Sequence, residues 1–254
     1  MLELKDIYKV YDAGTINENT LFEGFNLTVN DGEFVSVVGS NGSGKTSILN
    51  VICGSMDIQG GAVFFDGRNI TNMKDFMRYS KIGRVYQNPS MGTCADMTIL
   101  ENLSMADNKG KSYNLRAGTN KKRIDHYKER LCSLNLGLEN KLYTKAGALS
   151  GGQRQALALL MSVMAPIEML ILDEHTAALD PSTAESIMQM TDKIIKENSI
   201  TAMMVTHNVR YALEYGNRLI MLHKGRTIVD LKNEEKLSAK KEDILSLYNN
   251  INIE

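Results

Sequence analysis

The sequence predicts an α/β fold built around a mostly parallel β-sheet. Residues 34–38 (FVSVV) form a continuous apolar run, as expected of a strand that is buried on both faces. A glycine-rich loop and a helical segment from about residue 44 follow it. Two further apolar runs, 169–172 (MLIL) and 202–205 (AMMV), flank a segment with helical periodicity at 182–197. This strand–helix–strand order is typical of parallel pairing.

The remaining segments complete the outline of the fold. Alternating apolar and polar residues predict a first strand at 2–10, and a second strand at 25–29 (FNLTV) ends in an Asn30-Asp31-Gly32 turn. Near the end of the sequence we expect a hairpin of strands 218–222 and 226–230 and a short helix at 241–249. In the helix at 182–197, the apolar residues Ile187, Met190 and Ile194 are expected to face the core.

The length of 254 residues fits one large domain with an inserted subdomain. Residues 98–106 and 120–135 have helical patterns, and the polar segment 107–123 between them is irregular. We therefore expect a helical subdomain at 88–160, inserted into a sheet-containing core made of 1–87 and 161–254.

Composition and charge exclude several classes of function. The chain has 29 Lys and Arg against 30 Asp and Glu, so a net charge of −1 provides no basic field for nucleic acid. The three cysteines lack a CxxC pair, which argues against a zinc site or a disulfide framework and fits a reducing cytoplasm. The first residues do not resemble a signal peptide, and no segment approaches the length needed to span a bilayer. We expect a soluble cytoplasmic protein that reaches a membrane only through a partner.

The first chemical motif is the glycine-rich loop GSNGSGKT, which matches the phosphate-binding pattern GxxxxGK[ST]. Backbone N–H groups and a helix N-terminus can wrap a triphosphate, and glycines let the backbone approach it. Lys45 is expected to reach the β- and γ-phosphates of ATP, and the Thr46 hydroxyl to bind Mg²⁺. The predicted nucleotide-binding residues here are Gly39, Ser40, Asn41, Gly42, Ser43, Gly44, Lys45, Thr46 and Ser47.

The second motif is a pair of carboxylates after the apolar run 169–172. Asp173 and Glu174 follow a predicted buried strand, at the sheet edge where phosphates bind in such folds. We expect Asp173 to hold Mg²⁺ through water and Glu174 to act as the general base for the attacking water. Solvated acids at the end of a strand are the alternative, which the phosphate loop upstream disfavours.

The third motif, LSGGQ, places Ser150, Gly151, Gly152 and Gln153 at the start of a predicted helix. Alone it predicts only a helix cap or a second anion cradle. The succession of GSNGSGKT, LSGGQ and ILDE, however, resembles the ABC ATPase family, whose defining signature is LSGGQ. The resemblance covers nearly the whole chain. It implies a P-loop NTPase core with a mixed, mostly parallel sheet, an N-terminal antiparallel β subdomain and an inserted α-helical subdomain.

The resemblance also assigns single residues that position alone does not single out. By this likeness, Gln87 is a lid glutamine that senses Mg²⁺ and water, and His207 is a switch histidine at the γ-phosphate. Asp180 lies in a dimer-contact loop, Ala178-Leu179-Asp180. Tyr11 corresponds to the aromatic residue that stacks on adenine, with Tyr8 and Phe22 as rivals because the connection 13–20 is long.

Two phosphate cradles on different subdomains predict a two-fold dimer in which each subunit offers LSGGQ to the nucleotide of the other. ATP then favours the closed homodimer, and hydrolysis weakens it. In the family this motion is passed to integral-membrane permease subunits that dock near Gln87 and residues 88–105. Met91, Met97 and Met105 suit such a docking surface, and core packing explains them equally well.

Several longer segments, including IGRVYQNPSMGT and DEHTAALDP, resemble one bacterial importer branch. Its permeases are similar to those for branched-chain amino acids, its binding proteins are of the lipoprotein type, and tryptophan or tyrosine is the proposed cargo. His175 departs from the family, which usually has proline there, and we expect it to pack beside the dimer loop without a catalytic role. The alternatives are an exporter or lipoprotein-release ATPase, a non-transport ABC ATPase of DNA repair or translation, and a small-molecule kinase, which LSGGQ disfavours.

Overall fold

The computed structural model describes residues 1–111, 118–119 and 121–253, and these form two compact units. The first unit contains Met1–Tyr79 and Ser199–Glu254, and the second contains Ser80–Asn198. Residues 112–117 and 120 of the predicted polar connection and helix start lie outside the described residues. The expected helical subdomain at 88–160 falls within the second unit, which also holds two strands and a long helix; the exact subdomain boundary stays a prediction.

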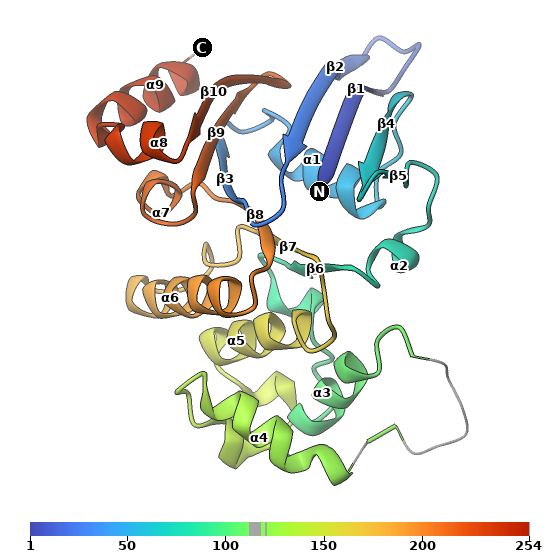
Figure 1. The fold of residues 1–254 in the computed structure, drawn as a ribbon, viewed down its shortest axis with the longest axis vertical. Coiled ribbons are helices and arrows are strands. Elements are labelled where there is room, and N and C mark those ends of the chain that lie inside the picture. The colour runs from blue at the N-terminus through green and yellow to red at the C-terminus, as the bar shows by residue number, and fades with distance from the viewer. Residues whose placement is uncertain (112–117, 120, 254) are drawn as a thin grey trace. The chain divides into compact units, whose positions relative to one another are not determined.

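The first unit begins with an antiparallel sheet, as the resemblance implied (Figure 1). Its strand order is β2-β1-β4-β5, from β1 (Leu2–Tyr11), β2 (Asn19–Val29), β4 (Gly60–Phe65) and β5 (Arg68–Asn69). Strand β1 is central because it pairs with both β2 and β4. Leu2 and Leu4 are buried as the alternation predicts, but a register shift between Leu4 and Ile7 changes the phase, so that Ile7 is the next buried residue.

The same unit holds four strands of the main sheet in the order β10-β9-β3-β8. Strand β3 (Phe34–Gly39) runs parallel to β8 (Thr201–Val205) and to β9 (Arg218–His223), whereas β10 (Arg226–Lys232) closes the predicted hairpin with β9. Every residue of β3 and β8 is buried, as the apolar runs predicted. The helices of this unit are α1 (Lys45–Cys53), α2 (Asp75–Arg78), α7 (Val209–Glu214), α8 (Glu234–Ser238) and α9 (Lys241–Ile253).

The second unit combines a parallel strand pair with the inserted helices. Strands β6 (Ile82–Val85) and β7 (Met169–Asp173) are hydrogen-bonded in parallel, with Val85 opposite Leu172. The helices are α3 (Ile99–Asp107), α4 (Ile124–Cys132), α5 (Gly151–Ser162) and α6 (Pro181–Glu197). Short 3-10 turns lie at Pro89–Met91, Lys121–Arg123, Leu138–Lys141 and Ala146–Ala148.

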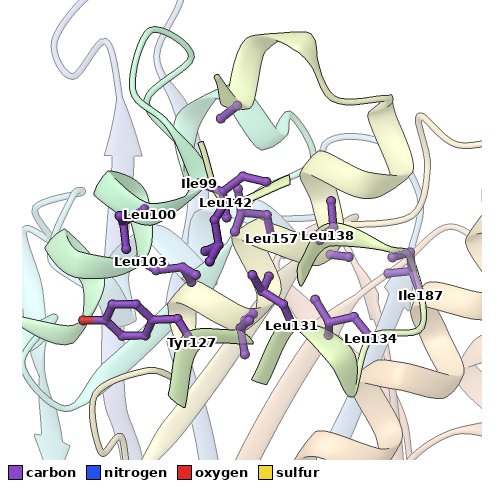
Figure 2. Packing of buried hydrophobic residues seen from close by; sticks show 13 residues of the cluster. Ile99, Leu100, Leu103, Tyr127, Leu131, Leu134, Leu138, Leu142, Leu157 and Ile187 are labelled. Carbon is purple, nitrogen blue, oxygen red and sulfur yellow. The ribbon is translucent and has the colours of Figure 1, made fainter. Parts of the chain in front are cut away.

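One hydrophobic cluster joins the inserted helices (Figure 2). Ile99 and Leu103 of α3 meet Tyr127 and Leu131 of α4, and Leu157 of α5 lies among them. Helix α6 contributes Ile187. Ile187 is buried as predicted, and Met190 is half-buried and packs against the cluster. Ile194 is also only half-buried, because the buried face extends to the neighbouring residues Ala184, Met188, Thr191 and Ile195. A helix that packs on two sides buries a wider stripe than one apolar row indicates.

Candidate functional site

The phosphate loop of the first unit connects β3 to α1 and curls around its own lysine. The Lys45 Nζ donates hydrogen bonds to the carbonyl oxygens of Gly39 and Ser40, each at 2.8 Å. Gly44 caps α1 in the left-handed conformation, with φ at 100° and no side chain bonded to the first turn. The N-terminal N–H groups of α1 therefore have no side-chain cap, which is the arrangement that binds an anion at a helix start.

Close packing around the loop explains why glycine is needed at its end. A Cβ atom on Gly44 would lie 2.7 Å from Cζ of Phe22, a fully buried ring of β2. The end of β9 supports the loop from another side, since Gly225 N donates to Ser43 O at 3.1 Å and His223 Nδ1 lies 3.4 Å from Ser40 Oγ. His223 was not singled out from the sequence, because no pattern places the end of β9 against this loop.

The aromatic candidates for the base differ in exposure. Tyr11 ends β1, and its hydroxyl lies 3.3 Å from Ser47 Oγ at the start of α1. Tyr8 is 40% exposed on the same strand. Phe22 is 0% exposed and packs on Phe25 with ring centroids 5.0 Å apart, so it presents no free face for stacking. The structure therefore disfavours Phe22 and leaves Tyr11 connected to the phosphate-loop helix.

His207 lies at the same end of the main sheet as the phosphate loop. Strand β8 is parallel to β3, with Val205 opposite Val37, and Thr206 N donates to Val37 O at 3.1 Å. The next residue, His207, is exposed, and its Nδ1 lies 3.5 Å from the Tyr248 hydroxyl of α9. The carboxyl ends of neighbouring parallel strands thus bring Gly39 and His207 to one edge of this unit.

The two predicted carboxylates belong to the second unit. Strand β7 is buried throughout and ends at Asp173, and Glu174 follows in the left-handed conformation with φ at 48°. A turn follows it, because Ala177 N donates to Glu174 O at 2.9 Å. Gln87 is exposed two residues after β6, the parallel neighbour of β7. The side chains of Gln87, Asp173 and Glu174 therefore originate from the same end of one strand pair.

Helix α5 supports the segment before Gln87. The buried Gln155 donates from Nε2 to the carbonyl oxygen of Tyr86 at 3.1 Å.

The three methionines after Gln87 differ in exposure. Met91 and Met105 are 68% and 56% exposed, so the prediction of core packing is wrong for these two, whereas Met97 is half-buried. Exposed flexible side chains of this kind suit an adaptable contact surface.

His175 has a structural place in the turn after Glu174. It is 2% exposed, and its Nε2 lies 3.2 Å from Thr191 Oγ1 on α6. The Thr191 hydroxyl donates to Ile187 O, so it accepts the proton of Nε2. Burial lowers the pKa of His175 to about 4, which keeps the ring neutral. His175 therefore packs against α6 and presents no catalytic group to solvent. The expected packing beside the dimer loop stays a prediction.

The LSGGQ segment starts helix α5 with a complete capping box. Gln153 N donates to Ser150 Oγ at 3.3 Å, and Ser150 N donates to Gln153 Oε1 at 3.4 Å. Gly152 packs against Thr183 of α6 so closely that a Cβ atom would collide with the threonine methyl. A groove of about 560 Å³ borders this helix start, between the residues that follow α4 and helix α6.

Asp180 is the N-cap of α6. Its Oδ1 accepts from Thr183 N at 3.0 Å, and hydrogen bonds from Thr183 lower the pKa of its carboxyl. The adjacent Pro181 stands at the first helical position. The local role of Asp180 is thus to start α6, and the predicted contact with a second nucleotide-bound subunit stays a prediction.

These features supply the parts that a nucleotide hydrolase needs. The first unit provides an anion cradle with a lysine and an exposed histidine at the same edge. The second provides two carboxylates and a serine-capped helix start. Oxygen donors such as the Thr46 hydroxyl and the Asp173 carboxylate are the ligands that Mg²⁺ prefers.

Comparison with known proteins agrees with this set of parts. Residues 22–177 match the family model described as "ABC transporter". The chain belongs to the ABC transporter family. It is an ATP-binding cassette, an ATPase coupled to transport, as the sequence reading expected.

Curated ABC transporter relatives extend over nearly the whole chain. A tyrosine transport ATP-binding protein of Clostridioides difficile is 45% identical over 98% of both chains. A phosphonates import ATP-binding protein, PhnC, of Lactobacillus gasseri is 31% identical over 96% of this chain and 92% of its own length.

Solved ABC cassettes share the fold. The dimeric cassette MJ0796 bound to ADP and Pi is 30% identical and covers 91% of this chain and 98% of its own, with a TM-score of 0.77. The ADP conformation of the cassette MJ1267 is 26% identical, covers 100% of this chain and 98% of its own, and has a TM-score of 0.81. The predicted fold class is confirmed.

Proposed function

We propose that this ABC cassette drives import of a small solute, in the first place an aromatic amino acid such as tyrosine, through a membrane permease. The observation that carries the proposal is the 45% identity to a tyrosine transport ATP-binding protein over 98% of both chains. The phosphonate import relatives are more distant, at 31% identity for the one from Lactobacillus gasseri. Among the described residues, none of the helices combines the length and hydropathy of a membrane span. By its likeness to the family, the chain is proposed to act at the inner face of the cell membrane, bound to its permease.

The nucleotide site is proposed to use the residues that the sequence motifs predict. Lys45 and the N–H groups of the phosphate loop bind the β- and γ-phosphates, and Tyr11 stacks on the adenine. Thr46, Asp173 and Gln87 would hold Mg²⁺, which would screen the phosphate charge. Glu174 takes the proton of the attacking water, and His207 contacts the γ-phosphate.

Two copies complete the site. Ser150, Gly151, Gly152 and Gln153 form an anion cradle at the start of α5, and we propose that they bind the γ-phosphate held by the partner's phosphate loop. Support comes from the dimeric cassette bound to ADP and Pi, which is similar over 91% of this chain. The Ser150 hydroxyl already accepts from Gln153 N and keeps its own proton to donate to a phosphate oxygen.

Glu174→Gln tests this two-subunit site. Glutamine cannot take the proton of the water, whereas the phosphate cradle is unchanged, so the variant should bind MgATP and accumulate as a dimer. Size-exclusion chromatography with light scattering measures the mass with MgATP and with MgADP. Glu174→Gln combined with Lys45→Ala is the matched control and should stay monomeric. A Glu174→Gln variant that is monomeric in saturating MgATP would contradict the dimeric site.

A pull-down from solubilised native membranes tests the transport assignment. We expect the tagged chain to recover a multi-spanning permease and a lipoprotein-type binding protein. Thermal shifts of that binding protein with tyrosine, tryptophan and a phosphonate then compare the candidate cargoes, and the largest shift is expected with an aromatic amino acid. Recovery of an export permease without a binding protein would overturn the importer proposal. Recovery of ribosomal or DNA-repair proteins without a permease would overturn it as well.

A further inference from the structure

Arg84 is a buried charge on β6 that the nucleotide site described above does not use. It lies opposite Ile171 in the parallel pairing of β6 with β7, and its side chain is 6% exposed. Its Nη2 donates to Asp173 Oδ2 at 2.7 Å, and the Asp173 side chain is 12% exposed. The guanidinium also stacks on the Tyr86 ring, at 4.7 Å from the centroid. Both groups belong to the second unit, so the contact is internal to one compact body.

The partner of Arg84 is the carboxylate proposed to bind Mg²⁺. Removal of one partner from a buried ion pair of this kind strongly destabilises the protein, because no solvent stabilises the remaining charge. A carboxylate has two oxygens with about four acceptor positions, so Asp173 can keep Arg84 on Oδ2 and still hold a metal-bound water. The guanidinium nevertheless neutralises the carboxylate and repels a second cation nearby. Arg84 thus lowers the attraction of this carboxylate for a free divalent ion.

We propose that Arg84 is the resident counter-ion of Asp173, which suppresses divalent-metal binding to the nucleotide-free chain and makes metal binding depend on the triphosphate. The inference rests on the proposed role of Asp173 as a metal ligand. A nucleotide brings several negative charges of its own, which offset the positive charge of Arg84. The metal is then expected to enter together with ATP, and an unloaded cassette keeps Asp173 paired and the strand end folded. Arg84 acts through Asp173 and is a positioning residue.

Arg84→Met tests this with nucleotide-free protein. Methionine has a similar length and no charge, so Asp173 is left buried without a counter-ion. In EDTA the variant should unfold at a lower temperature than the wild type, and Mn²⁺ should restore part of the loss. Titration with Mn²⁺, followed by electron paramagnetic resonance of the free ion, should show an affinity at least about tenfold higher than that of the wild type.

Three further variants make the result decisive. Arg84→Gln removes the charge but retains a hydrogen-bond donor, and provides the same test if Arg84→Met does not fold. Arg84→Lys keeps a cation and should show the weak Mn²⁺ binding of the wild type. Arg84→Met with Asp173→Asn removes both charges and should lose the gained Mn²⁺ binding while regaining stability in EDTA.

The outcomes separate this inference from the proposed function. Equal Mn²⁺ affinity in the wild type, Arg84→Met and Arg84→Gln overturns the role of Arg84, even if ATP still requires Mg²⁺ to bind tightly. Asp173→Asn alone tests the role of Asp173: if this variant keeps the full effect of Mg²⁺ on ATP affinity, measured by calorimetry, the proposed metal ligand is wrong.

Discussion

The phosphate loop of the first unit and the carboxylate end of β7 in the second unit are built by different means. In the loop, the backbone determines the structure: glycines allow its conformation, and Lys45 donates hydrogen bonds to two carbonyl oxygens of the loop itself. At the end of β7, side chains hold the structure: Arg84 pairs with Asp173, and His175 bonds to Thr191. Substitutions in the first region should therefore cost ligand binding, and substitutions in the second should cost stability.

The largest effect is expected for Lys45→Ala. Loss of the ammonium removes the charged group proposed to contact the β- and γ-phosphates, and charge-assisted hydrogen bonds are the stronger class. ATP affinity, measured by isothermal titration calorimetry, should fall by about 100-fold, or about 3 kcal/mol. Thermal unfolding without nucleotide should change much less than ATP affinity, because removing the buried ammonium relieves its desolvation and so offsets the loss of its hydrogen bonds to Gly39 and Ser40. Unchanged ATP affinity would exclude Lys45 as the phosphate ligand, and the two regions would then not differ in this way.

A smaller effect is expected for Thr191→Val, and it should fall on stability and not on ATP affinity. Valine has the same shape but cannot accept the proton of His175 Nε2, so a buried N–H group is left unpaired. The free energy of unfolding in urea should fall by about 1–3 kcal/mol, while ATP affinity should stay unchanged. The exposed Thr227 of β10 gives the matched control, since Thr227→Val should remain within about 0.5 kcal/mol of the wild type. A large loss of ATP affinity in Thr191→Val would show that the two regions are not separable in this way.

The smallest expected effect is a pH dependence of stability caused by Lys236, a buried charge of the first unit. Lys236 is 4% exposed and donates to the carbonyl oxygens of Tyr215 and Gly216, and burial lowers its pKa from 10.5 to about 8. Between these two values the unfolded chain binds more protons than the folded chain, so stability should rise as the pH rises from about 8 to 10.5. The expected gain, after allowance for solvent screening, is on the order of 1 kcal/mol.

Urea unfolding of the wild type and Lys236→Met across this pH range measures the effect of Lys236. The exposed Lys240 supplies the control, because Lys240→Gln should keep the pH dependence of the wild type. Parallel curves for the wild type and Lys236→Met would show that this buried ammonium does not shift its proton equilibrium on folding.

Continuous apolar runs made the main sheet predictable. The segments that became β3, β7 and β8 are buried at every residue, and such runs need no knowledge of distant partners. Strand β4 was not predicted, because its sequence GGAVFF has two glycines and no clear alternation. Its pairing with β1 joins residues about sixty positions apart, and a local pattern carries no information on such pairing.

The same limit applies to the site. GSNGSGKT, LSGGQ and ILDE predict the proposed nucleotide-binding segments because each is a local motif. The pairing of Arg84 with Asp173 joins residues 89 positions apart, and a single arginine in the run IGRVY gives no indication of its partner. The approach of Tyr248 to His207 depends on the packing of α9 and is likewise invisible in the sequence.

The capping box of α5 carries a consequence for how this cassette tolerates change. The hydroxyl of Ser150 serves the helix through a lone pair and retains its proton for another acceptor. An aspartate at this position caps a helix about as well as serine but has no proton to give and repels phosphate. Under the proposed role of Ser150, helix capping and phosphate binding place separate demands on one oxygen atom, so a chain with a different cap can keep the fold while losing phosphate binding. Selection for a stable helix alone does not maintain the serine.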